Sequence, residues 1–151
     1  MEEEDCIFCK VVRAEIPSYK VYEDDKYIAI LDIFPNVRGQ TLVMPKKHVD
    51  SYVFKLDDQQ LADFIKVTKR VVKLIENKLD VKRVHLVLEG TGINHLHAKL
   101  YPALGMKSEY EEIIRDETIY FEKYPGYVTT LVGPKAKDEE LKKLQKKFMK
   151  K

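Results

Sequence analysis

The chain has 151 residues, of which 44% are hydrophobic and 34% charged, with a formal net charge of +2. This length suits one domain with a real hydrophobic core, and the small net charge argues against nucleic acid or a membrane surface as partner. The two cysteines exclude a disulfide scaffold. The acidic N-terminus does not resemble a signal peptide, and no segment approaches the ~20 apolar residues of a membrane span, so a cytoplasmic protein is expected.

Alternating apolar residues predict three short strands in the first part of the chain. Residues 21–32 read as two strands around a turn at Asp24 and Asp25, and residues 41–45 read as a third. The loop at 34–39, which contains a proline and a glycine, separates the third strand from the others. We expect these three strands to pair antiparallel in one sheet.

One long helix is predicted over residues 56–79. Asp57 can cap it, with Gln60 three residues later completing an acidic relative of the capping box. Apolar residues recur at helical spacing and predict ordinary core packing. The predicted stripe consists of Leu61, Phe64, Ile65, Thr68, Val72, Ile75 and Leu79.

Two further strands are predicted after the helix. The first covers residues 83–89, and the Gly90–Gly92 turn leads to the second, at residues 95–101, which Pro102 ends. The expected architecture is α+β, a mostly antiparallel sheet with one long helix packed on it.

Residues 107–151 are expected to form an extension packed on the domain of residues 1–106. A charged helix at 108–116, an extended segment at 126–132 and a lysine-rich helix beginning near Asp138 are predicted there. The aromatic cluster at 120–127 either lines the substrate end of a site or packs the last helix against the sheet, and packing is the favoured interpretation.

The last predicted strand carries the chemistry-bearing side chains. Because side chains alternate along a strand, His95, His97, Lys99 and Tyr101 are expected on one face. Burying two imidazoles and an ammonium without partners is costly, so this face is expected to meet water, a ligand or a metal. His85, alone on its strand, is interpreted as structural or exposed.

Cys6 and Cys9 form a Cys-x-x-Cys pair with three possible meanings. It could be a redox pair, half of a metal site, or a coincidence. A redox pair is typical of a βαβ unit, which the sequence does not predict. A tetrahedral zinc needs two more ligands, and His48 and the strand histidines are available.

Taken together and in order, six motifs resemble the histidine-triad (HIT) family. The resemblance covers about residues 5–104, and the joint order is far more specific than any single motif. The motifs are Cys-Ile-Phe-Cys-Lys at 6–10, Glu-Ile-Pro-Ser at 15–18, Val-Tyr-Glu-Asp-Asp at 21–25, Leu-Asp-Ile at 31–33, Gly-Gln-Thr-Leu-Val-Met-Pro-Lys-Lys-His at 39–48, and the His-x-His strand at 95–97.

The resemblance implies a nucleotide-binding α+β fold, usually homodimeric, that hydrolyses or transfers nucleoside monophosphates. The middle motif histidine, His97 here, attacks the α-phosphorus and forms a nucleotidyl-histidine intermediate. The substrate is expected to be an AMP derivative such as a dinucleoside polyphosphate or a phosphoramidate. A neutral imidazole suits this role because it is both a nucleophile at pH 7 and a tolerable leaving group from phosphorus.

The resemblance also implies binding residues. Asp32 is expected to hold the ribose hydroxyls, and Phe8, Val11 and Ile33 match the apolar positions around the base. Backbone N–H groups of the turn ending at Gly92 could stabilise phosphoryl oxygens. Members with an N-terminal Cys-x-x-Cys bind zinc, and the corresponding ligands here are Cys6, Cys9, His48 and His95. Four protein ligands leave zinc no open position, so its role is structural.

The sequence departs from the family pattern at the third motif position, which is Lys99 instead of histidine. Leu88 also stands where many members have a polar residue, and the connection to the motif is short. A lysine could still offer a point charge to phosphate and disfavour protonation of His97. The alternative is a nucleotide-binding module without turnover, acting as a sensor or partner-binding protein.

Overall fold

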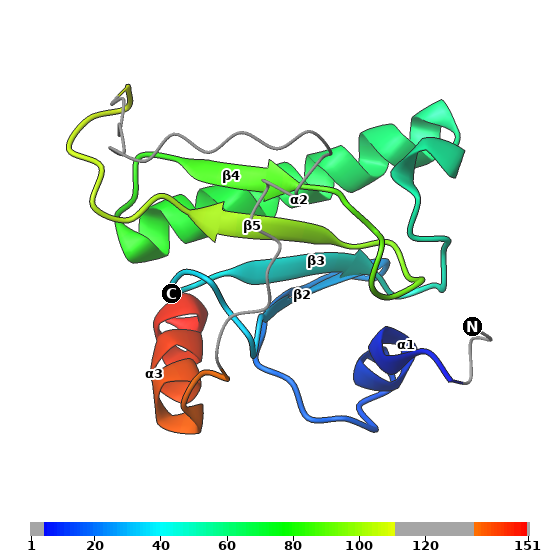
Figure 1. Ribbon diagram of the computed structural model, residues 1–151, viewed down its shortest axis with the longest axis horizontal. Coiled ribbons are helices and arrows are strands. Elements are labelled where there is room, and N and C mark those ends of the chain that lie inside the picture. Colours follow the sequence, from blue (N-terminus) through cyan, green and yellow to red (C-terminus); the bar gives the residue numbers. More distant parts are fainter. Residues whose placement is uncertain (1–4, 111–134, 151) are drawn as a thin grey trace, which may run out of the picture.

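The computed structural model describes residues 5–110 and 135–150. Five strands form one antiparallel sheet in the order β1-β2-β3-β5-β4. Figure 1 shows β4, β5, β3 and β2 from top to bottom, with the long helix α2 behind β4 and β5 and the short helix α1 below the strands. The elements are α1 (Ile7–Val12), β1 (Lys20–Glu23), β2 (Tyr27–Leu31), β3 (Thr41–Pro45), the 3-10 turn η1 (Val53–Lys55), α2 (Asp58–Leu79), β4 (Val84–Val87), β5 (Ala98–Pro102) and α3 (Asp138–Met149).

The predicted α+β fold and antiparallel sheet are confirmed, and so is the cap of the long helix. The Asp57 carboxylate accepts from the Gln60 backbone N–H at 2.8 Å, and the Gln60 side chain accepts from the Asp57 N–H at 3.2 Å. These two bonds satisfy donors that have no partner inside the first turn. Residue 80, in the left-handed region, ends the helix.

Alternation along β2 and β3 divides the core between the two faces of the sheet. Ala29 and Val43 pack on the α2 side, whereas Ile28 and Met44 pack on the α1 side. Leu141, Leu144 and Phe148 of α3 are buried in the cluster on the α2 side. The helices α2 and α3 therefore pack on one face of the sheet and α1 packs on the other, so a site on the α1 side is separated from α2 by the sheet.

The predicted apolar stripe of α2 is partly wrong. Ile65 is 39% exposed, while Val67 and Val71, absent from the predicted stripe, are buried. The buried stripe is set by the angle at which α2 crosses the sheet, and a sequence pattern does not contain that angle. Phe64, Thr68, Ile75 and Leu79 are buried as predicted.

The last strand begins later than predicted, at Ala98 instead of residue 95, and includes Pro102. The Leu96 N–H donates to the Val49 carbonyl at 2.8 Å, outside the sheet ladder. His95 and His97 therefore lie in the loop that leads into β5. Their positions are fixed by contacts to distant segments and not by strand pairing.

The helix α1 was not predicted. Six residues are too few for a helical period to show in a sequence, and such a short helix depends on tertiary packing. Nearly all of the predicted helix at 108–116, together with the aromatic cluster at 120–127 and the extended segment at 126–132, lies outside the described residues. The last helix begins at Asp138 as predicted.

Candidate active site and metal centre

Four side chains from three distant segments converge beside α1. Their ligand atoms all lie within 4.8 Å of one another. The Cys6 and Cys9 sulfurs are each 3.5 Å from His95 Nδ1, and the Cys9 sulfur is 3.3 Å from His48 Nδ1. In a tetrahedral zinc site, Zn–S and Zn–N bonds of about 2.3 and 2.0 Å place neighbouring S and N atoms about 3.5 Å apart. The donor set and its spacing fit zinc.

The orientation of His95 suits a metal ligand. Its side chain is fully buried, and its Nε2–H donates to the Pro45 carbonyl at 2.9 Å. This bond places the hydrogen on Nε2 and leaves the lone pair of Nδ1 facing the sulfurs. Metal-binding histidines are commonly oriented by such a bond from their other ring nitrogen.

The turn of α1 explains the spacing of the cysteine pair. Cys6 is the N-cap of the helix and Cys9 lies inside its first turn, where the Lys10 N–H donates to the Cys6 carbonyl at 3.1 Å. Residues three apart on a helix lie on the same face. Both thiols are therefore presented to the two imidazoles from one side of α1.

A cavity of about 510 Å³ lies on the α1 side of the sheet. It is lined by every residue that the sequence predicted for catalysis or nucleotide binding, together with several that it did not. The predicted residues are Phe8, Val11, Asp32, Ile33, Gly92, His97 and Lys99; the additional polar ones include Asn36, Gln40, Glu89, Thr91 and Tyr101.

One ring nitrogen of His97 is bonded to the backbone, and the other is left for a ligand. Its Nδ1–H donates to the His95 carbonyl at 2.7 Å, so Nε2 carries the lone pair. The ring of Phe8 packs edge-on against the imidazole, with centroids 5.1 Å apart. Burial, and to a smaller extent the nearby Lys99 ammonium, lowers the pKa of His97 below its usual value. The imidazole is therefore neutral at pH 7 and able to act as a nucleophile.

Lys99 and Glu89 form an ion pair inside the cavity. The Lys99 ammonium donates to the Glu89 carboxylate, and the two side chains are 18% and 21% exposed. The loop that carries Glu89 is clamped, because Ser51 Oγ donates to the Gly90 carbonyl at 2.6 Å. Gly90 has φ +64°, and a Cβ there would lie 2.4 Å from the Ser51 carbonyl oxygen. Only glycine fits this contact.

The remaining predicted residues complete the lining of the cavity. Phe8 and Val11 are buried, whereas Ile33 is 41% exposed and forms part of the rim. The Asp32 carboxylate accepts from the Gln40 side-chain amide at 2.6 Å and from the Phe34 N–H at 2.8 Å. These bonds fix the orientation of the carboxylate at the end of β2.

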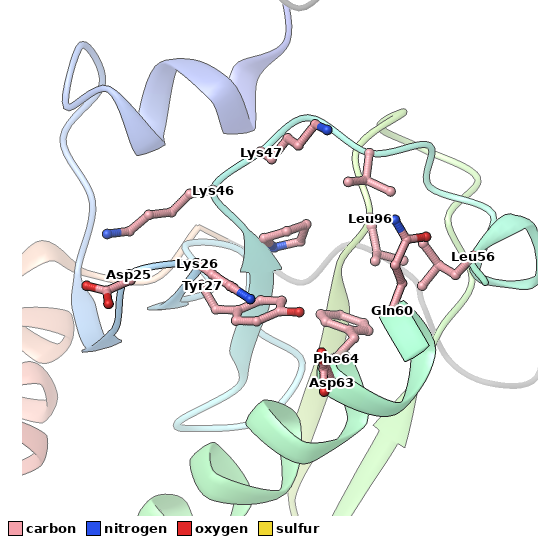
Figure 2. A pocket seen from close by; sticks show the side chains of 12 residues that line it. Asp25, Lys26, Tyr27, Lys46, Lys47, Leu56, Gln60, Asp63, Phe64 and Leu96 are labelled. Atoms are coloured by element: carbon pink, nitrogen blue, oxygen red, sulfur yellow. The ribbon is translucent and has the colours of Figure 1, made fainter. Parts of the chain in front are cut away.

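A second cavity, of about 440 Å³, lies on the α2 side of the sheet. Figure 2 shows Leu96 and Phe64 near one another in it, with Lys26, Lys46 and Lys47 among the other side chains around it. Leu96 thus points away from the cavity that its neighbour His97 lines. The alternation predicted for this segment holds, although its first residues lie outside the strand.

Sequence reasoning missed Glu89 and Gln40 as residues of the first cavity. Their side chains contact Lys99 and Asp32, which are ten and eight residues away in the sequence, and no local pattern signals such pairs. His85, interpreted as structural or exposed, is exposed on β4.

A protein-family model described as "HIT domain" matches residues 13–102 of the chain. An uncharacterized HIT-like protein of Methanocaldococcus jannaschii is 39% identical over 102 residues, which cover 64% of this chain and 78% of that protein. An adenosine 5'-monophosphoramidase of Saccharomyces cerevisiae is 36% identical over 109 residues, covering 68% of this chain and 65% of the enzyme. The crystal structure of a hypothetical histidine triad nucleotide-binding protein of Sulfolobus tokodaii has a TM-score of 0.70 at 31% identity, covering 95% of this chain and 89% of that one.

The fold is α+β, with one antiparallel sheet. A buried histidine, His97, faces a cavity just before strand β5, so the protein is of a class with a histidine-based site. The chain belongs to the HIT family.

Proposed function

We propose that this protein cleaves nucleotides that carry a substituted α-phosphate, with His97 as the nucleophile. The observation that carries the proposal is the orientation of His97, whose Nδ1–H is held by the His95 carbonyl while Nε2 is left for a ligand. The cavity beside it has the volume of a small-molecule site. A nucleotide hydrolase or a nucleotidyl transferase fits this arrangement.

The walls of the cavity support a nucleotide as the ligand. Phe8, Val11 and Ile33 offer apolar surface for a base, and the oriented Asp32 carboxylate can accept hydrogen bonds from both ribose hydroxyls. Gly92, in the turn before His97, can bring backbone N–H groups close to phosphoryl oxygens. An AMP derivative is the proposed substrate, in line with the named activity of the Saccharomyces cerevisiae relative.

The proposed reaction has two displacements. His97 Nε2 attacks the α-phosphorus and the leaving group departs; water or another acceptor then attacks the phosphorus, and His97 leaves as a neutral imidazole. The Lys99 ammonium offers positive charge to the phosphoryl oxygens, where the family pattern implies a third histidine. Two displacements at one nucleophile split a difficult step into two easier ones.

We also propose that Cys6, Cys9, His48 and His95 hold one structural zinc ion. The donor set, the spacing and the Pro45 bond to His95 support this assignment. Bound zinc would tie α1 to the loops that carry His48 and His95. The donors fill a tetrahedral shell, so the role is structural.

A homodimer is proposed from the family pattern, with β4, an edge strand of the sheet that residues 5–110 form, as a candidate contact; Leu86 on it is 42% exposed among the described residues. A cytoplasmic location is proposed from the sequence. In the described part of the chain, every helix is too short or too polar to cross a bilayer.

Product analysis tests the function. Wild-type protein incubated with adenosine 5'-phosphoramidate or a diadenosine polyphosphate is expected to release AMP, and His97→Ala is expected to lower kcat on the order of a thousandfold or more. Equal turnover by His97→Ala would show that the nucleophile is assigned wrongly. A wild-type protein that binds AMP but releases none from either substrate would favour the binding-module alternative.

A further inference from the structure

The family pattern implies a single imidazole at the third motif position, whereas this chain has an ion pair there. The Lys99 ammonium donates to the Glu89 carboxylate, and both side chains line the cavity of His97. Both are only about one-fifth exposed, at 18% and 21%. The pair is thus largely sheltered from water and lines the same cavity as His97.

The backbone holds Glu89 in place independently of Lys99. Ser51 Oγ donates to the carbonyl of Gly90, and the Ser51 N–H donates to the Asn94 side chain at 3.0 Å. The Gly90 backbone approaches Ser51 too closely for a side chain. The loop after β4 is therefore fixed on the segment that follows His48, and the Glu89 carboxylate is presented to Lys99 from a rigid support.

A lysine needs such a partner more than a histidine does. Its four-carbon stem is flexible, and its ammonium is a strongly hydrated point charge. Lys99 lies on β5 two residues beyond His97, about 7 Å along the chain. The Glu89 carboxylate restrains the ammonium at one place in the cavity, which reduces the entropy cost of holding it there during reaction.

We infer that Glu89 is a positioning residue that holds Lys99 as the proton donor to the leaving group. The inference rests on the proposed function, in which His97 displaces that group from phosphorus. It assigns Glu89 a role that the family pattern does not supply, and it favours substrates whose leaving group departs only when protonated, such as amines and alkoxides.

The proton balance closes over the two displacements. In the first, the His97 Nε2 lone pair forms the new P–N bond, the bond from phosphorus to the leaving nitrogen breaks, and Lys99 gives one proton to that nitrogen. In the second, water forms a P–O bond, the P–N bond to His97 breaks, and the neutral Lys99 amine takes the proton from water. Lys99 is an ammonium again at the end, and Glu89 keeps its charge throughout.

Two substrates separate this role from a structural one. Adenosine 5'-phosphoramidate has an amine leaving group that needs a proton, whereas the p-nitrophenyl ester of AMP releases a phenolate that does not. General acid catalysis contributes about 10²–10⁴-fold. Glu89→Gln is therefore expected to lower kcat on the phosphoramidate about a hundredfold, to lower kcat on the ester by a much smaller factor, and to change KM little on either.

A double-mutant cycle tests whether Glu89 acts through Lys99. Glu89→Gln combined with Lys99→Met is expected to be no slower on the phosphoramidate than Lys99→Met alone. Glu76→Gln is the matched control, because Glu76 pairs with Lys73 at 2.6 Å on the exposed side of α2, and its activity is expected to equal wild type. Glu89→Asp, which keeps the carboxylate, is expected to recover part of the loss.

The outcomes are distinguishable. Inactive wild-type protein overturns the proposed function. Active wild-type protein overturns the present inference alone if Glu89→Gln slows both substrates equally, if its effect adds to that of Lys99→Met, or if Glu89→Asp recovers nothing. Thermal melting and AMP binding of each variant identify loss of folding, and if Glu89→Gln melts early, Glu89→Met, which also lacks the carboxylate, replaces it in the cycle.

Discussion

The ring of Phe8 makes T-shaped contacts with two histidines, its centroid lying 5.1 Å from that of His97 and 5.8 Å from that of His95. Phe8 belongs to α1, which begins directly after Cys6 and carries Cys9. The proposed metal centre and the proposed nucleophile therefore share one short helix. Whatever holds α1 in place also holds one wall of the nucleotide cavity.

The first prediction concerns Phe8→Ala. Phe8 is 7% exposed, so removing its ring leaves a cavity beside both imidazoles and is expected to cost about 3 kcal/mol of the free energy of unfolding. AMP affinity is also expected to fall, because the ring lines the cavity. Urea unfolding and calorimetric AMP titration measure the two effects. Ile7→Ala, at an exposed position of the same helix, is expected to cost much less; an equal cost would contradict the role of the Phe8 ring.

The second prediction concerns the metal. Elemental analysis of purified protein is expected to give about one zinc per chain, falling sharply in His48→Ala and Cys6→Ser. Chelation is expected to lower the melting temperature and AMP affinity together, since α1 loses its anchor. His85→Ala is the control, because His85 is exposed on β4. If the zinc content is unchanged in both ligand variants, these residues do not form the zinc site.

The third prediction concerns Gly90→Ala. Its φ of +64° disfavours a side chain, and the new Cβ would meet the Ser51 carbonyl oxygen at 2.4 Å. Strain of this kind costs about 1–3 kcal/mol. Gly105→Ala separates the two causes, because Gly105 also has a positive φ, +86°, but open space around its Cβ. Urea denaturation is expected to show a larger loss for Gly90→Ala, and equal losses would mean that the contact with Ser51 is unimportant.

The fourth prediction concerns Tyr101 and alkaline pH. Its hydroxyl is the one buried side-chain polar atom without a hydrogen-bond partner among the described residues. Burial, reinforced by the charges of Glu89 and Asp32, raises the pKa of Tyr101 to about 12. A tyrosine whose folded pKa is raised leaves the free energy of unfolding unaffected below its unfolded pKa of about 10 and lowers it as pH rises toward 12.

Tyr101→Phe is therefore expected to be neutral or slightly stabilising at pH 7, because it removes a buried hydroxyl that has no partner. Above pH 10, the free energy of unfolding is expected to fall more steeply for wild type than for the variant. Urea unfolding at a series of alkaline pH values measures both. A parallel decline would show that Tyr101 does not titrate with a raised pKa.

The sequence alone predicted the elements whose cause is local. The cap of α2 depends on two residues three apart, and the strands β1 to β3 depend on alternation and turn residues, so each pattern is visible in a short window. The ordered motifs also identified the residues around the first cavity, because a family resemblance records which side chains occur together. These features need no knowledge of how distant segments meet.

Tertiary structure alone decided the rest. The helix α1 is too short to be predicted, and its place depends on Cys6 and Cys9 meeting two distant imidazoles. The Leu96 bond to Val49 removes His95 and His97 from the strand that their alternation predicted. Glu89 reaches Lys99 only because β4 pairs with β5 in one register, with the next loop clamped on Ser51. Glu89 and Lys99 are ten residues apart, Ser51 and Gly90 are 39 residues apart, and a local sequence pattern does not show that either pair will meet.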